Sequence, residues 1–161
     1  MMGTPVRIRK KREEVEQRYV AEFVAKHFPN AQKTFFQKAL GDLPWRYAAH
    51  SGHDYRYFLR YAKRADAVVI TPEHVVVIET ETRRPITGLS ELLVYKSLLP
   101  ETVDLKPYLL GRSPRLILVA PLPDDEVMEE AAKHGIEFVI FFPEWMREHL
   151  IRWGVLPEEG G

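Results

Sequence analysis

The sequence predicts an α/β fold in which a mixed central β-sheet is flanked by helices. Two runs rich in β-branched residues, "ADAVVI" and "HVVVIETE", are joined by the turn sequence "TPEH", which predicts a hairpin. Residues 115–142 follow a strand-helix-strand pattern, which predicts a parallel pair joined by a right-handed crossover. A hairpin together with a crossover requires a mixed sheet. Because both hairpin runs are apolar on both faces, helices are expected on each side of it.

The first half of the chain is predicted to begin with two helices. Apolar residues recur at i, i+4 spacing over about 11–28, which predicts a helix that ends at Pro29. A second, short helix is expected over 32–40, closed by Gly41. The stretch 45–63 is rich in tyrosine and arginine, and we expect a strand with a loop there.

The second half is predicted to alternate helices and strands after the hairpin. The expected elements are a helix over 85–99, a buried strand over 115–123, a helix over 124–135, a buried strand over 136–142 and a last helix over 143–153. Aspartates at the start of the third of these and a glycine at its end are typical helix caps. A proline at the first turn is likewise typical of the start of the last helix.

The bulk properties of the sequence favour one domain. A length of 161 residues suits a single domain over 1–161, with a basic N-terminal arm over about 1–12 and a flexible tail over about 154–161. The formal net charge is zero, so no overall field attracts a polyanion.

Cysteine usage and hydropathy restrict the chemistry and the compartment. The absence of cysteine excludes disulfides, thiolate metal sites and cysteine nucleophiles. There is no signal-peptide pattern and no apolar run of transmembrane length, so we expect a soluble, cytoplasmic protein without membrane contact. The 12 prolines and the many charged residues would suit a thermophile.

Acidic side chains are expected to converge at one end of the sheet. If Pro72 and Glu73 form the centre of the hairpin turn, Asp66 lies opposite Glu79, and directly opposite residues project on the same face. The two-residue period of a strand places Glu81 on that face too. Bare carboxylates this close would repel one another and resist burial. Hard oxygen ligands at this density suit Mg²⁺ or Mn²⁺ rather than zinc, so a divalent-metal site is predicted.

An ordinary strand end would explain the same residues. Asp66 could begin its strand at the solvent edge, while Glu79 and Glu81 pair with neighbouring arginines. A slip of the hairpin register would also separate Asp66 from Glu79. The pattern alone leaves both interpretations open.

The stretch "RADAVVITPEHVVVIETET" resembles the hairpin core of the PD-(D/E)XK nuclease superfamily. That core carries an acid at the start of one strand and, after the hairpin, an acid, any residue and usually a lysine. Asp66, Glu79 and Glu81 occupy these positions, so Glu81 stands where the family usually has lysine. The resemblance implies a restriction-endonuclease-like core of helix, three strands, helix and strand (αβββαβ), to which this chain adds a C-terminal helix, strand and helix.

The activity implied by the resemblance is metal-dependent hydrolysis of phosphodiester bonds in nucleic acid, with DNA as the expected substrate. Asp66, Glu79, and the Thr80 carbonyl are expected to hold Mg²⁺ or Mn²⁺, which lowers the pKa of a bound water. Glu81 is expected to orient that water or to bind a second ion. Lys96 on the following helix is the candidate for the missing catalytic cation, although its place on a leucine stripe favours a surface lysine.

Further residues are implied around this centre. The first helix of the family often adds an acid, for which Glu16 is the candidate. Glu91 and Tyr95 have the i, i+4 spacing at which the family often carries a glutamine and a tyrosine facing the site. The residues expected to contact nucleic acid are Arg64, Arg83, Arg84, Tyr95 and, in the basic arm, Arg9, Lys10, Lys11 and Arg12.

Two alternatives to an active nuclease stay open. A nuclease-like fold without catalysis could serve as a DNA-binding or protein-interaction module, which Glu81 and the zero net charge favour. A structural α/β domain could instead use its aromatic residues for dimerisation. The converging acids favour the enzyme, because carboxylates near phosphate would weaken a module that only binds. A homodimer is expected if both strands of a duplex are cut.

Overall fold

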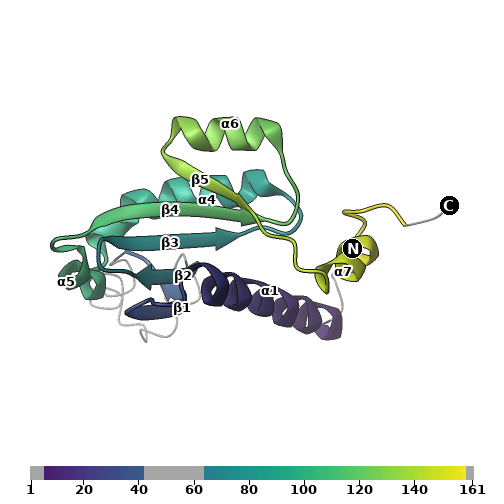
Figure 1. Cartoon of the computed structure of the whole chain (residues 1–161), viewed down its shortest axis with the longest axis horizontal. Coiled ribbons are helices and arrows are strands. Elements are labelled where there is room, and N and C mark those ends of the chain that lie inside the picture. Colours follow the sequence, from purple (N-terminus) through teal and green to yellow (C-terminus); the bar gives the residue numbers. More distant parts are fainter. Residues whose placement is uncertain (1–5, 42–63, 159–161) are drawn as a thin grey trace, which may run out of the picture.

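The structure, a computed structural model, describes residues 6–41 and 64–158. Its elements are α1 (Val6–His27), β1 (Lys33–Ala39), β2 (Arg64–Ile70), β3 (His74–Thr80), α4 (Pro85–Leu98), the 3₁₀ turns η1 (Leu99–Glu101) and η2 (Val103–Leu105), α5 (Lys106–Leu109), β4 (Ser113–Ala120), α6 (Asp125–Lys133), β5 (Ile136–Ile140) and α7 (Met146–Arg152) (Figure 1). Within these two ranges, and apart from the short pieces between α4 and β4, the elements follow the αβββαβ order with an added αβα that is expected from the sequence.

One mixed sheet carries the five described strands in the order β1-β2-β3-β4-β5. Strands β1, β2 and β3 pair antiparallel, whereas β3, β4 and β5 pair parallel. The hairpin has the expected register, with Val68 opposite Val77 and Ile70 opposite Val75. Its turn is closed by a 3.0 Å hydrogen bond from the Thr71 amide to the His74 carbonyl. The mixed-sheet prediction is therefore confirmed.

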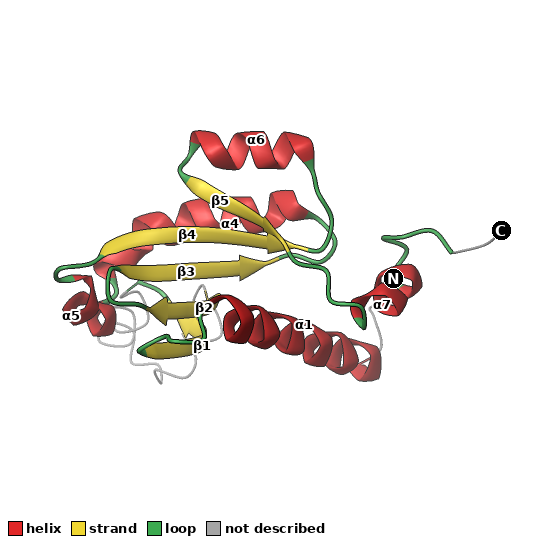
Figure 2. Ribbon diagram, in the orientation of Figure 1, coloured by secondary structure: helices red, strands yellow, loops and turns green. Residues whose placement is uncertain are grey.

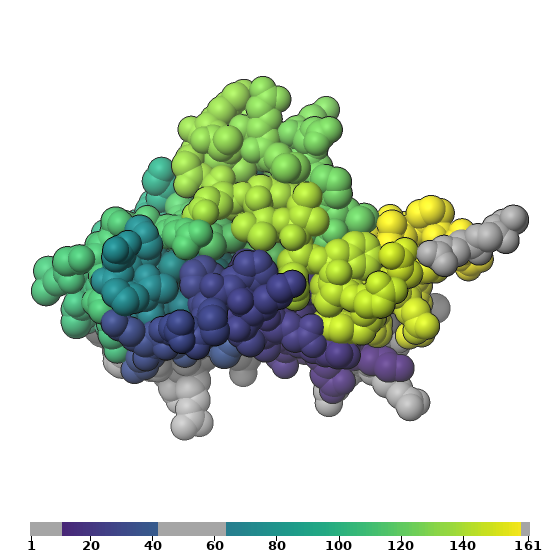
Figure 3. Space-filling view, viewed as in Figure 1, coloured from purple at the N-terminus to yellow at the C-terminus, as the bar shows by residue number. Residues whose placement is uncertain are grey.

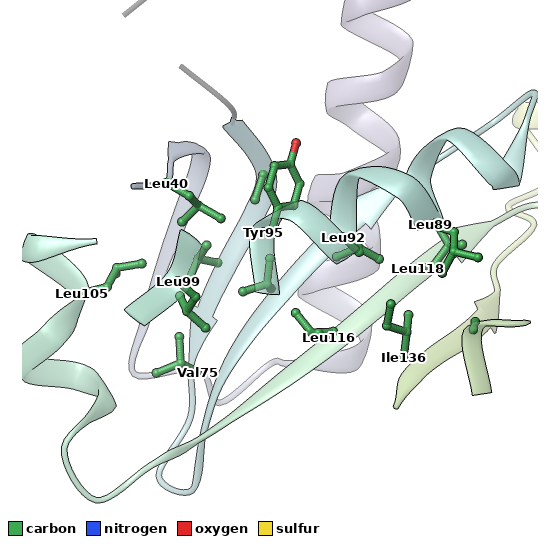
Figure 4. Close-up of a cluster of buried hydrophobic side chains, with 14 of the residues drawn as sticks. Leu40, Val75, Leu89, Leu92, Tyr95, Leu99, Leu105, Leu116, Leu118 and Ile136 are labelled. Carbon is green, nitrogen blue, oxygen red and sulfur yellow. The ribbon is translucent and has the colours of Figure 1, made fainter. Parts of the chain in front are cut away.

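Helices cover both faces of the sheet (Figure 2). On one face, Leu89, Leu92 and Tyr95 of α4 pack with side chains of β3 and β4 such as Val75 and Leu118 (Figure 4). Val75, Val76, Val77 and Ile78 are all fully buried, so β3 is a central strand with apolar residues on both sides, as its sequence indicates.

The opposite face is covered by α1 and α7, the first and last helices. Tyr19 and Phe23 of α1 share a buried cluster with Met146 and Leu150 of α7. The two helices lie side by side, purple and yellow in Figure 3, and the Trp145 indole just before α7 donates to Glu22 of α1 at 2.7 Å. The N-terminal part of the chain is thereby held next to its C-terminal part.

The expected helix over 32–40 is wrong, because these residues form strand β1. Hydrogen bonding to the edge of β2, from Lys33 opposite Ile70 to Ala39 opposite Arg64, overrides the local helix preference. The strand expected over 45–63 lies outside the described residues. Strand β1 therefore supplies the first of the three strands in the αβββαβ order.

The described chain includes parts of the predicted basic arm and of the predicted tail. Helix α1 begins at Val6, so the described part of the predicted basic arm is helical. In the predicted tail, Val155 and Leu156 pack against the α1–α7 cluster. Over the described ranges, none of the helices has both the length and the apolar character needed to cross a membrane.

Candidate active site

Acidic side chains from three elements meet where β2 begins and β3 ends. Asp66 lies near the start of β2, Glu79 and Glu81 lie at the end of β3 and just after it, and Glu16 lies on α1. The Asp66 carboxylate is close enough to the other three to raise the pKa of each of them. The structure therefore brings together the carboxylates that the sequence indicates.

Glu79 is the most deeply buried member of this acid cluster (Glu16, Asp66, Glu79 and Glu81). Its side chain is only 6% exposed, and its Oε2 atom has no hydrogen-bond partner among the described residues. Burial, followed by the neighbouring Asp66 and Glu91 carboxylates, raises the pKa of Glu79 to about 11. Glu79 therefore carries a proton at neutral pH when no cation is near.

The Asp66 side chain is held from both neighbouring strands. Its Oδ2 accepts hydrogen bonds from the Thr80 amide at 2.8 Å and from the Thr80 hydroxyl at 2.9 Å. Its Oδ1 accepts from the Gln37 side-chain amide at 3.2 Å. Backbone pairing between β2 and β3 ends at Ala67 and Ile78, so the Asp66 carboxylate continues the connection where the ladder stops.

Gln37 is a site residue that the sequence did not indicate. It lies in β1 between the residues paired with Ala67 and Ala65, and it therefore faces Asp66. Its φ of 51° falls in the left-handed region, which costs a non-glycine residue about 1 kcal/mol or more. No pattern could have found Gln37, because its contact with Asp66 depends on the pairing of β1, which the sequence did not predict.

Glu81 links the acid cluster to helix α4. Its Oε1 accepts from the backbone amides of Arg83 and Arg84, each at 3.3 Å, in the turn before α4. Burial raises the pKa of Glu81, the two amides lower it, and Glu91 and Asp66 raise it, so that the balance lies above its usual value. The carboxylate can accept a proton more readily than an exposed glutamate.

Glu16 on α1 shares these surroundings from the other face of the sheet. Part of its side chain is exposed, but its carboxyl end is covered enough that burial raises its pKa. Asp66 and Glu81 raise that pKa further, and Arg12 and Arg83 lower it. Glu16 therefore lies between the acid cluster and the nearest arginines.

Tyr95 closes the α4 side of the cluster. Its side chain is 2% exposed, and its hydroxyl donates to the Arg64 carbonyl at 2.8 Å, with Glu91 Oε2 at 3.4 Å. Burial, followed by the charges of Glu79, Glu91 and Asp66, raises the pKa of Tyr95. The hydroxyl therefore keeps the proton that it donates to the Arg64 carbonyl.

Gly88 allows α4 to lie directly on the end of β3. A β-carbon there would come within 2.5 Å of Leu118 Cδ1, 3.4 Å of Glu81 Cβ and 3.7 Å of Glu79 Cγ. The absence of a side chain therefore sets the distance between the helix and the acid cluster.

We expect Gly88→Ala to lower the free energy of unfolding by about 1–3 kcal/mol, because overpacking against buried Leu118 outweighs the gain in helix propensity. Urea unfolding would measure this change, with the exposed Thr87→Ala on the same helix as the matched control. A Gly88→Ala protein more stable than the wild type would show that α4 does not depend on this close approach.

Lys96 is not brought to the acid cluster, so its candidacy as the catalytic cation is not supported. Its ammonium is exposed and donates to the His134 carbonyl at 3.4 Å, at the end of α6. It lines a separate cavity of about 380 Å³ together with Leu116 and His134. Because Lys96 follows Tyr95 directly in the helix, its side chain projects in a different direction, toward α6 and away from the acid cluster.

The arginines around the cluster differ in their positions. Arg64 and Arg84 are exposed, at the start of β2 and just before α4. Arg83 lies near Glu16 and lines a pocket with Lys11 and Arg12 of α1. Arg9 and Lys10 belong to the first turns of the same helix.

The donor atoms of the cluster fit a hard divalent cation. Asp66, Glu79, Glu81 and the Thr80 carbonyl offer only oxygen, and Glu79 Oε2 is buried without a partner among the described residues. Within residues 6–41 and 64–158, no three His, Cys, Asp or Glu side chains already stand around a common point. An ion would therefore compete with the hydrogen bonds that Asp66 and Glu81 make to the protein.

Comparisons with known proteins give one similar solved structure. No family model matches the chain, and no curated protein matches it significantly. The crystal structure of a repair endonuclease from Pyrococcus abyssi is similar over 79% of this chain, with a TM-score of 0.48 and 19% sequence identity. The similar region is 47% of that protein, so this chain spans about half of its length.

Proposed function

We propose that this chain is a metal-dependent nuclease that hydrolyses phosphodiester bonds in nucleic acid, with DNA as the expected substrate. The observation that carries this proposal is that Asp66 lies close enough to Glu16, Glu79 and Glu81 to raise the pKa of each, while the buried Glu79 Oε2 has no hydrogen-bond partner among the described residues. Gathering acids in this way costs stability, and a divalent cation would offset that cost. A domain that only folds or only binds phosphate gains nothing from it.

The chain's own residues would divide the work as follows. Asp66, Glu79 and the Thr80 carbonyl would hold Mg²⁺ or Mn²⁺, which when bound polarises a phosphate and acidifies a water. Thr80 and Gln37 keep the Asp66 carboxylate in place. Glu81 would accept the proton of the attacking water, a role that its raised pKa favours.

The cationic residues would bind and orient the substrate. Arg83 lies beside Glu16 and could neutralise phosphate charge as the nucleic-acid strand enters the site. Arg64 and Arg84 stand exposed on either side of the strand end, where they can contact the backbone of the nucleic acid. These contacts would position the substrate without reading its sequence.

One observation favours a second candidate, an inactive nucleic-acid-binding module with a nuclease-like fold. Glu81 takes the place of the usual lysine. Lys96, the other candidate for the catalytic cation, is hydrogen-bonded to the His134 carbonyl. In that case the acid cluster would bind an ion without cutting.

A cleavage assay separates the two candidates. Linear duplex, single-stranded, branched and RNA substrates would be incubated with the protein in EDTA, Mg²⁺ or Mn²⁺. The nuclease proposal expects cleavage of one or more substrates with Mg²⁺ or Mn²⁺ and none in EDTA. Substrate binding without cleavage in any metal would favour the inactive module.

Gln37 offers a finer test of the same site. We expect Gln37→Ala and Gln37→Gly both to lower cleavage about tenfold, because each removes the amide that holds Asp66. Their free energies of unfolding should differ by about 1 kcal/mol in favour of glycine, which tolerates the φ of 51°. Cleavage assays and urea unfolding on the pair would show this, and unchanged cleavage in both variants would contradict a positioning role.

A further inference from the structure

The N-terminal part of α1 lies near α7 (Figure 1). A basic pocket lined by residues of both segments lies beside the acid cluster. Its volume is about 420 Å³, and the side chains that matter here are Lys11, Arg12, Arg83, His149, Arg152 and Trp153. No acidic residue is among the described residues that line it. Four permanent cations around one cavity repel one another, and an anion in the cavity would relieve that repulsion.

Trp153 organises two of these cations. The Arg12 guanidinium lies 5.5 Å and the Arg83 guanidinium 5.6 Å from the centre of its ring. Cation–π contact restrains both planar groups, so less entropy is lost when they bind an anion. The Arg12 Nε atom is buried and has no hydrogen-bond partner among the described residues. A donor left in this state favours a ligand with several acceptor oxygens.

His149 lines the pocket, and its pKa depends on the charges around it. Burial lowers the pKa of His149, and the cations Arg152, Arg18 and Lys11 lower it too, while Glu148 opposes them. The ring centres of Trp145 and Trp153 lie 6.0 and 5.7 Å from the centre of the His149 ring. An anion that neutralised the pocket would therefore raise the pKa of this imidazole.

The pocket and the acid cluster are neighbours. Arg83 lines this pocket and also a smaller cavity, of which Glu81 is another lining residue. Arg12 and Arg83 both lower the pKa of Glu16 in the acid cluster. A chain of phosphates that reaches the acids can therefore also reach the pocket.

We propose that this pocket binds a phosphate group of the nucleic-acid chain next to the phosphate that is cut, and so fixes where cleavage occurs. The proposal rests on the proposed function for the source of the phosphate. It assigns His149, Arg152 and Trp153, which the sequence did not indicate, to substrate binding. Phosphate contacts of this kind position a substrate without reading its sequence.

The test measures binding in EDTA, so that cleavage plays no part. Oligonucleotides and, separately, inorganic phosphate would be titrated into the wild type, Arg152→Gln and Lys133→Gln. Lys133 is the matched control, because it ends α6 as Arg152 ends α7 and is also exposed. Thermal unfolding would confirm that both variants fold.

The expected result is a weakening of oligonucleotide binding by about fivefold or more in Arg152→Gln, with the salt dependence of log K reduced by about one. Lys133→Gln should bind like the wild type. The His149 pKa, followed by NMR, should rise when the oligonucleotide binds. Equal weakening in both variants, or a His149 pKa that does not respond, would overturn the proposal.

The two sources of phosphate are told apart by the same titrations. A His149 response to inorganic phosphate but not to oligonucleotide would overturn the assignment to nucleic acid. Absence of cleavage with intact, Arg152-dependent oligonucleotide binding would contradict the proposed nuclease function and leave the pocket standing.

Discussion

Asp66→Asn is expected to lower metal-dependent cleavage by about a thousandfold while the protein stays folded. Asparagine keeps the shape of the side chain and can still accept from the Thr80 amide, which Asp66 binds at 2.8 Å. It removes the negative charge that would hold the ion between β2 and β3. Single-turnover cleavage with Mg²⁺ measures the effect, and urea unfolding checks the fold.

Glu130→Gln is the matched control for this experiment. Glu130 lies exposed on α6, where it pairs with Lys133 at 3.4 Å. The same loss of one negative charge there should leave cleavage unchanged. If Asp66→Asn cleaved as fast as the wild type, the acid cluster would have no part in cleavage.

Glu79→Gln is expected to raise the free energy of unfolding at neutral pH in the absence of metal. Burial and Asp66 raise the pKa of Glu79 to about 11, so the folded state holds a proton that the unfolded state releases near its ordinary pKa of 4.5. The stability contributed by this carboxyl is complete below about pH 4.5 and is lost as the pH rises toward 11. Glutamine mimics the neutral form at every pH.

The difference between Glu79→Gln and the wild type should be on the order of 3 kcal/mol at pH 7 and close to zero at pH 4. Urea unfolding in EDTA across this range would show it. The same variant should lose metal-dependent cleavage, because a neutral amide is a poor ligand for a hard cation. A Glu79→Gln protein less stable than the wild type at pH 7 would contradict the account of Glu79.

Glu137→Gln provides a control of opposite sign. A hydrogen bond from Arg115 lowers the pKa of Glu137, with a distance of 2.6 Å between Arg115 Nε and Glu137 Oε2. Its contribution to stability is therefore present at neutral pH and lost as the pH falls through the lowered pKa. Glu137→Gln should destabilise the protein at pH 7, where Glu79→Gln stabilises it.

The hairpin and its acids could be predicted because local rules determine them. The proline-containing turn predicts the hairpin register, and that register places Asp66 beside the end of β3. Glu16 could be singled out among the acids of α1, although only the structure shows its approach to Asp66 and Glu81.

The parts that the sequence did not predict depend on contacts between distant segments. Strand β1 has a sequence compatible with a short helix and becomes a strand because β2 offers an unpaired edge. Gln37 joins the site only through that pairing. The basic pocket needs Arg12 of α1 and Trp153 after α7 together, and no local pattern predicts that these helices are neighbours.

The central claim is that the acid cluster exists to hold a divalent cation, and Mn²⁺ binding tests it most directly. Calorimetric titration of Mn²⁺ into the metal-free wild type, Asp66→Asn and Glu130→Gln would be compared at pH 7 in two buffers of different ionisation enthalpy. We predict binding to the wild type and to Glu130→Gln with release of protons, because Glu79 is protonated before the ion enters. Binding should be lost in Asp66→Asn. Equal Mn²⁺ binding by all three proteins, or by none, would contradict the account.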